Sequence, residues 1–137
     1  MTGELVTNKL SERFRYRNGI EKNGYFIDAA LTDDERMVCL ALASGGPLGC
    51  GANDIEEKRI ELGSIEALVA EGVVRKRNRL QMAKDLIEDE TGMGIVDNDT
   101  LKKAHEIVGR GEVAENMEVY YQVIPTLFWY MDLVYDG

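Results

Sequence analysis

The ten aromatic residues of this 137-residue chain stand near its two ends, and none occurs from residue 27 to residue 119. Aromatic side chains are large and dominate the burial of apolar surface in cores and interfaces. We therefore expect the two ends to pack on each other or on a partner, and the middle of the chain to be aliphatic and helical. The aromatic residues are Phe14, Tyr16, Tyr25, Phe26, Tyr120, Tyr121, Phe128, Trp129, Tyr130 and Tyr135.

The N-terminal aromatic group predicts a β-hairpin. Residues 13–17 read RFRYR, so that aromatic and basic side chains alternate with the period of a half-buried strand. Two Asn-Gly pairs follow, at residues 18–19 and 23–24, and Asn-Gly supplies the positive φ of tight hairpin turns. Residues 25–27 would then form the return strand.

The rest of the chain predicts five or six helices. Thr32 and Glu35 have the spacing of a capping box, which places the start of the first of these helices. Glycine and proline at residues 45–47 should end it. The predicted fold class is therefore α+β, predominantly α-helical, with an N-terminal β-hairpin followed by five or six helices. Further helices are expected near residues 53–62, 64–71, 75–90 and 98–109 and after Pro125.

Composition describes an ordinary globular chain and restricts its partners. The chain is 45% apolar and 30% charged, and its length fits a single domain over residues 1–137. Sixteen Lys and Arg against 25 Asp and Glu leave a net charge of −9. This net negative charge disfavours binding of nucleic acid or anionic lipid over a large part of the surface, because both ligands need a cationic face. Two cysteines fit a reducing compartment, and the first residues lack a secretory segment, so we expect a cytoplasmic protein without membrane contact.

A local basic segment departs from this acidic background, and it contains Arg75, Lys76, Arg77 and Arg79. It follows the string GSIEALVAEGVV, and residues 31–84 resemble a winged-helix DNA-binding domain, where a recognition helix closes with a leucine and a glycine before a basic wing. The resemblance implies a helix, a helix-turn-helix and arginines that contact phosphates. The same arginines also fit another interpretation, in which they pair with the many carboxylates of the chain.

Cys50 leads to a third interpretation. The stretch from residue 31 to about residue 72 is similar to the helical family of carboxymuconolactone decarboxylases and alkylhydroperoxidase-like proteins, in which a cysteine pair and a histidine sit on adjacent turns. The resemblance implies a reactive thiol at Cys50, just before a helix start that would lower its pKa. Cys39, within MVCLALA, is expected to be a small core residue.

No pattern in the sequence predicts catalytic residues, a cofactor or a metal. His105 is the only histidine, and one imidazole cannot supply a multi-histidine metal site. Residues 89–100 resemble an EF-hand loop, but Met93 and Thr100 stand at loop positions 5 and 12, where calcium needs oxygen ligands and a bidentate Glu. No pair of carboxylates is distinguished as a general acid and base.

These observations predict a small acidic, non-catalytic regulator, adaptor or inhibitor that acts through protein contacts. Its partner, another protein or a second copy of the chain, would meet the C-terminal aromatic segment, because Trp and Tyr often anchor interfaces. By analogy with anti-restriction proteins, such a protein can also imitate the phosphate charge of DNA. The alternatives are a winged-helix regulator that uses the basic segment and a helical thiol enzyme that uses Cys50. The candidate partner-binding residues are Tyr120, Tyr121, Phe128, Trp129 and Tyr130.

Overall fold

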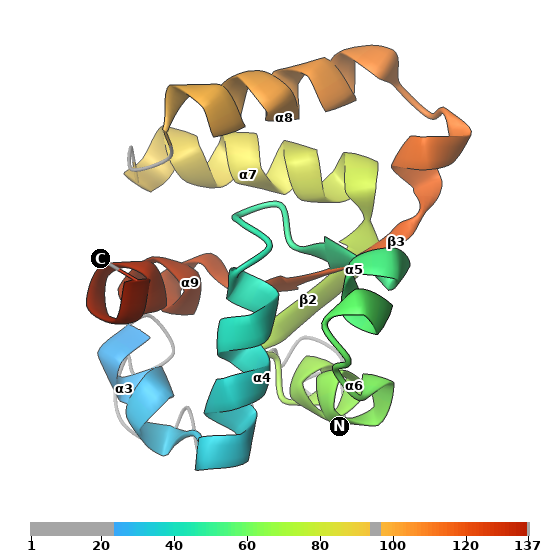
Figure 1. Ribbon diagram of the computed structural model, residues 1–137. Coiled ribbons are helices and arrows are strands. Elements are labelled where there is room, and N and C mark those ends of the chain that lie inside the picture. Colours follow the sequence, from blue (N-terminus) through green and yellow to red (C-terminus); the bar gives the residue numbers. More distant parts are fainter. Residues whose placement is uncertain (1–23, 94–96, 137) are drawn as a thin grey trace, which may run out of the picture.

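The computed structural model describes residues 24–93 and 97–136. It confirms the predicted α+β, predominantly α-helical class, because helices surround one small antiparallel sheet (Figure 1). No helix in the described ranges is long and apolar enough to cross a membrane. The helices are α3 (Gly24–Ala30), α4 (Asp33–Ala43), α5 (Ala52–Glu57), α6 (Leu62–Ala70), α7 (Arg79–Met93), α8 (Asn98–Arg110) and α9 (Pro125–Met131). The strands are β1 (Cys50–Gly51), β2 (Val74–Asn78) and β3 (Val119–Val123). Two short helices complete the described residues, the 3-10 helix η2 (Ala114–Met117) and the π-helix η3 (Asp132–Asp136).

The sheet joins three segments that are far apart in the sequence. Its strand order is β1-β3-β2, and both pairs are antiparallel. Cys50 lies opposite Tyr121, and β2 pairs along its whole length with β3, from Val74 opposite Val123 to Asn78 opposite Val119. The central strand is therefore contributed by the C-terminal aromatic segment.

The elements from α4 to β3 follow the order of a winged helix, with one large change. A helix, a short strand, two helices and an antiparallel strand pair occur in that order, and α7 and α8 stand between β2 and β3, where a wing would connect them. Figure 1 shows this helical pair on one side of the sheet and α4 and α6 on the other. The helix predicted from residue 75 is therefore wrong over residues 75–78, because β3 pairs with them as a strand.

Two apolar clusters hold these layers together. The larger cluster lies between the sheet and α3, α4, α6 and α9, and the smaller one lies mainly between α7 and α8. Trp129 is half-buried and packs against both. The middle of the chain contributes aliphatic side chains to the core, as its lack of aromatic residues requires; examples are Leu42, Ile65, Leu68 and Leu86.

The return strand predicted at residues 25–27 is wrong, because these residues belong to α3. Gly24, Ile27 and Asp28 are buried and are followed by buried Leu31, and this spacing is that of one helix face rather than of a strand. The first predicted strand and residues 18–23 lie outside the described residues. The packing of the two ends on each other is confirmed for α3 and α9, which approach so closely that a Cβ on Gly24 would lie 2.5 Å from the carbonyl oxygen of Thr126.

Candidate protein-binding surface

Two arginines of the basic segment lie on β2 and bind a carboxylate of α7. Asp85 is only 8% exposed, and its Oδ2 lies 2.7 Å from Arg77 Nη1 and 3.7 Å from Arg75 Nη1. Gln81 Nε2 donates to the other oxygen of Asp85 at 3.1 Å. A buried carboxylate is costly unless it is paired and hydrogen-bonded, so these arginines neutralise Asp85 and attach α7 to the sheet.

The other two cations of the segment are also paired within the chain. Lys76 Nζ lies 2.8 Å from Glu66 Oε2, and Arg79 Nη1 lies 2.7 Å from Glu115 Oε2. The hydrogen bond from Lys76 and a second one from the Tyr121 hydroxyl lower the pKa of Glu66. The interpretation in which the basic residues pair with carboxylates therefore agrees with the geometry of the whole segment.

The helix in the recognition position, α6, offers little to a DNA groove. Its exposed residues are Leu62, Gly63, Ala67 and Ala70, none of which has a side-chain hydrogen-bond donor. Residues 52–71, which span α5 and α6, contain six carboxylates and only two cations. Direct readout of bases needs polar side chains at the groove edge, and phosphates repel carboxylates.

Both thiols are buried and protonated. Burial raises the pKa of Cys39 to about 12, and burial, followed by the charge of Asp54, raises the pKa of Cys50. A reactive thiol needs the opposite shift, so this environment does not favour the thiol chemistry implied for Cys50. His105 is exposed on α8. Within residues 24–93 and 97–136, no three His, Cys, Asp or Glu side chains gather as metal ligands would.

The five candidate partner-binding residues have different environments. Tyr121 and Phe128 are each 6% exposed and belong to the chain's own core. Tyr120, Trp129 and Tyr130 are half-buried. The structure brings Phe128 and Trp129 together edge to face, with ring centroids 4.6 Å apart. The Tyr130 ring lies between those of Tyr25 and Tyr135.

An apolar surface is exposed where α3 meets α9 and η3. Aromatic rings form an edge-to-face series across it: Tyr25 lies 5.4 Å from Phe26 and 6.1 Å from Tyr130, which lies 6.5 Å from Tyr135. Tyr25 is 57% exposed and Tyr135 is 47% exposed. In η3, Leu133 and Val134 are also exposed. We call this set the apolar terminal surface; its residues are Tyr25, Phe26, Tyr130, Leu133, Val134 and Tyr135.

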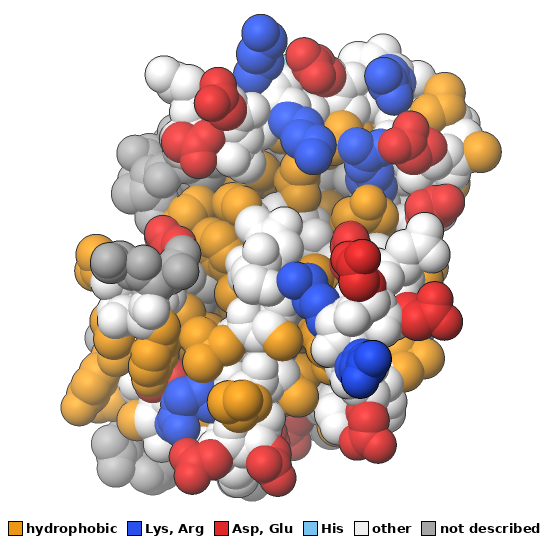
Figure 2. All heavy atoms as spheres, viewed as in Figure 1, with side chains coloured by type: hydrophobic (Ala, Val, Ile, Leu, Met, Phe, Trp, Pro, Cys, Tyr) orange, Lys and Arg blue, Asp and Glu red, His pale blue; other side chains and the backbone are white. Residues whose placement is uncertain are grey.

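A groove of about 350 Å³ adjoins this surface, between α4 and the C-terminal α9 and η3. Tyr135 belongs to both, so that the groove and the apolar terminal surface are continuous. Figure 2 shows apolar side chains gathered over this part of the molecule, at the lower left of the view. The groove is lined by Leu40, Ala43, Ser44, Phe128, Met131, Asp132 and Tyr135.

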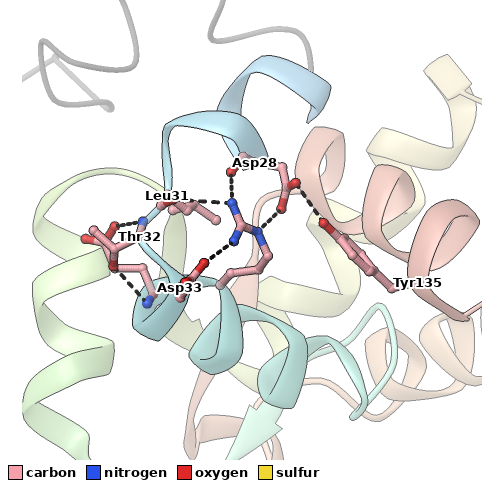
Figure 3. Close-up of polar contacts among 7 residues, drawn as sticks. Asp28, Leu31, Thr32, Asp33 and Tyr135 are labelled. Carbon is pink, nitrogen blue, oxygen red and sulfur yellow. Dashed lines mark hydrogen bonds and ion pairs between the residues drawn. The ribbon is translucent and has the colours of Figure 1, made fainter.

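A partly buried polar network centred on Asp28 holds η3 in place (Figure 3). The Tyr135 hydroxyl donates to Asp28 Oδ2 at 2.9 Å, and Arg36 Nε donates to Asp28 Oδ1 at 3.0 Å. Arg36 also donates to the carbonyl oxygens of Asp28 and Leu31, at 2.8 Å and 3.3 Å, and to Asp33 Oδ1 at 3.0 Å. Because Asp28 is only 6% exposed, these bonds satisfy a carboxylate that would otherwise be costly to bury.

Sequence reasoning missed the part of this surface that α3 and η3 supply. Leu133 and Val134 are the most exposed large apolar residues of the C-terminal segment, at 77% and 51%. The helical spacing of residues 24, 27, 28 and 31 could have identified α3. Nothing local could have shown that α3 packs beside η3, since the contact joins residues more than one hundred positions apart.

Comparisons of the chain with known protein families, curated proteins and solved structures find no match. The function of the surface is therefore inferred from its own geometry and charge.

Proposed function

We propose that the chain is a non-catalytic protein-binding module, a regulator, adaptor or inhibitor, that meets its partner through the apolar terminal surface. One observation carries this proposal: four aromatic rings of α3, α9 and η3 form a contiguous series at the surface, and η3 also exposes two aliphatic side chains, with Leu133 77% exposed and Tyr25 57% exposed. Contiguous exposed apolar patches of this kind typically mark sites of interaction. Tyrosine and phenylalanine are also enriched at interface cores relative to other surfaces.

Nucleic-acid binding is the second candidate, because the elements follow the order of a winged helix. The charges favour the protein-binding proposal instead. The cations of the basic segment are held by carboxylates of the chain, and the α5–α6 region is acidic. Mobility shift of duplex DNA by the intact wild-type chain at physiological salt tests this candidate. We expect no shift at micromolar protein, and a clear shift would favour the DNA-binding alternative.

The protein-binding proposal is tested by a matched pair of substitutions. Val134 lies in the apolar terminal surface and is 51% exposed, whereas Val113 precedes η2 and is 42% exposed. Tagged full-length Val134→Asp and Val113→Asp would be compared with wild type by cross-linking and capture from a lysate of the source cells. Because both substitutions add one charge at an exposed valine, both variants should fold.

We expect Val134→Asp to lose a cross-linked partner that wild type and Val113→Asp retain. Light scattering of the same three proteins distinguishes a second copy of the chain from a different partner. If all three proteins capture the same set of partners and have the same mass in solution, the apolar terminal surface is not the binding site and the proposal fails.

A further inference from the structure

We propose that the groove between α4 and the C-terminal α9 and η3 binds an amphipathic protein segment that carries Lys or Arg beside its apolar anchors. This inference rests on the proposed function, since it names the kind of partner that the same surface would bind. It is argued from the shape of the groove, from the charges around it and from the net charge of the chain.

The floor of the groove is suited to apolar side chains. Leu40 and Ala43 of α4 face Phe128 and Met131 of α9 across it. One turn before Leu40, Met37 is 67% exposed and extends the apolar face of α4. Methionine is flexible and polarisable, so it adapts to partners of different shape. A groove of about 350 Å³ between two helices fits the recognition mode in which an amphipathic helix inserts its apolar face.

Among the described residues, the one charged side chain that lines the groove is a carboxylate. Asp132 lines the groove, is exposed, and forms no ion pair with another residue in the described part of the chain. Arg36 is directed away, toward Asp28 and Asp33. Lys58 meets the groove at Ser44, where its Nζ donates to Oγ at 2.8 Å.

This charge pattern favours a cationic partner over the other possible occupants. A net charge of −9 accelerates the approach of a basic segment and slows that of a second copy. A twofold contact between two copies would bring the same patch, with Asp132, against itself. Anionic lipid headgroups and nucleic-acid phosphates would be repelled by Asp132 and by the net negative charge of the chain.

Trp129 allows binding to be measured directly. It is the only tryptophan of the chain, and its ring centroid lies 4.6 Å from that of Phe128, which lines the groove. The intact protein would be titrated with a tryptophan-free peptide of about 14 residues, roughly four helical turns, built from Leu and Lys in amphipathic order. A comparison peptide has Glu in place of every Lys. We expect the Lys peptide to change the fluorescence of Trp129 and to bind at least about tenfold more tightly than the Glu peptide.

Two substitutions with the same change of net charge locate the contact. Asp132→Lys reverses a charge in the groove, whereas Glu118→Lys reverses one just before β3, at the end of that strand remote from α9. Both positions are exposed, so circular dichroism should match wild type for both. We expect Asp132→Lys to weaken binding of the Lys peptide about fivefold to tenfold and Glu118→Lys to weaken it less than about twofold.

Three results would overturn the inference: no binding of the Lys peptide, equal binding of the Glu peptide, or equal effects of the two substitutions. Binding of phosphatidylserine vesicles with no response to the Lys peptide would overturn it as well. These results differ from failure of the proposed function. If Val134→Asp abolishes partner capture but the Lys peptide does not bind, the protein-binding function stands and the basic partner is wrong.

Discussion

The hydroxyl of Tyr135 donates a hydrogen bond to Oδ2 of Asp28 at 2.9 Å, across 107 positions of sequence. The same carboxylate accepts a hydrogen bond from Arg36 at 3.0 Å. One buried acidic side chain therefore joins α3, α4 and η3. Because η3 carries the exposed Leu133 and Val134, this carboxylate positions the part of the apolar terminal surface that we propose to bind a partner.

Substitution of Tyr135 by Phe tests this role of the hydroxyl. The variant keeps the ring but removes the donor to Asp28, so we expect a loss of about 1 kcal/mol in the free energy of unfolding. Amide hydrogen exchange in η3 should also become faster than in wild type. Tyr130→Phe is the control, because the described residues show no hydrogen bond of its hydroxyl. Equal stability and equal exchange in the two variants would show that the Asp28 contact does not hold η3.

The same hydrogen bond predicts a response to alkaline pH. It raises the pKa of Tyr135 above its usual value near 10, because Asp28 stabilises the neutral phenol as a donor. A raised folded pKa means that this stabilisation is complete below the usual pKa and is lost as pH rises through the folded value. We expect no loss between pH 7 and 9. Difference absorbance of tyrosinate between wild type and Tyr135→Phe should show the missing transition above pH 10, and a transition below that value would contradict the assignment.

Local sequence signals predicted the helices better than the strands. The capping box of Thr32 and Glu35 is present, with Glu35 N donating to Thr32 Oγ1 at 3.2 Å and Thr32 N donating to Glu35 Oε1 at 2.8 Å. Such a cap is formed by residues three positions apart, and can therefore be recognised in the sequence. Strand β2 depends instead on β3, whose residues lie 41 to 49 positions later, so a helix was predicted over the same residues.

The candidate site was predicted only in part. The uneven distribution of aromatic residues correctly indicated that the chain ends pack together, and Tyr130 does contribute to the exposed surface. It could not show which rings would be buried, and Tyr121 and Phe128 are buried in the larger apolar cluster. Leu133 and Val134 were missed because two apolar residues beside acidic ones have the same pattern in a core as on a surface.

Removal of the arginines that bind Asp85 should destabilise the fold. In Arg75→Ala/Arg77→Ala, the carboxylate of Asp85 stays buried, and within the described part of the chain it retains only the hydrogen bond from Gln81. We expect the free energy of unfolding to fall by about 3 kcal/mol, as measured by urea denaturation.

Adding Asp85→Asn to that double variant removes the buried charge and should restore about half of the loss. If the triple variant is no more stable than the double variant, the arginines do not act through Asp85. The comparison of the double and triple variants also serves as a control for tests of DNA binding. Alanine variants of these arginines can lose DNA affinity merely because the sheet is destabilised.

The cysteines should be unreactive in the folded protein. Burial raises the pKa of Cys39 to about 12 and also raises that of Cys50, so burial disfavours the reactive thiolate form of both. We expect a disulfide reagent to label neither thiol in buffer and both in urea. Cys50→Ser is the control that assigns any signal. Rapid labelling of Cys50 in the folded wild type, together with thiol-dependent peroxide turnover that the serine variant lacks, would instead support the thiol enzyme.

Two glycines in the turn before β1 both have a positive φ, but only Gly49 lies in close contact with another strand. Alanine substitutions at the two positions therefore distinguish the cost of backbone strain alone from the cost of strain plus a steric collision. Gly46 and Gly49 have φ of +91° and +88°, which side chains rarely adopt, and Gly49 N donates to the carbonyl oxygen of Gly46 at 3.0 Å. A Cβ on Gly46 would meet nothing within 4 Å, whereas a Cβ on Gly49 would collide with the carbonyl oxygen of Tyr121 in β3. We therefore expect Gly46→Ala to cost about 1 kcal/mol of unfolding free energy and Gly49→Ala at least about 3 kcal/mol, measured by urea denaturation. Equal losses would mean that β3 can shift away from this turn, and that the close approach of the turn to the central strand is not required for folding.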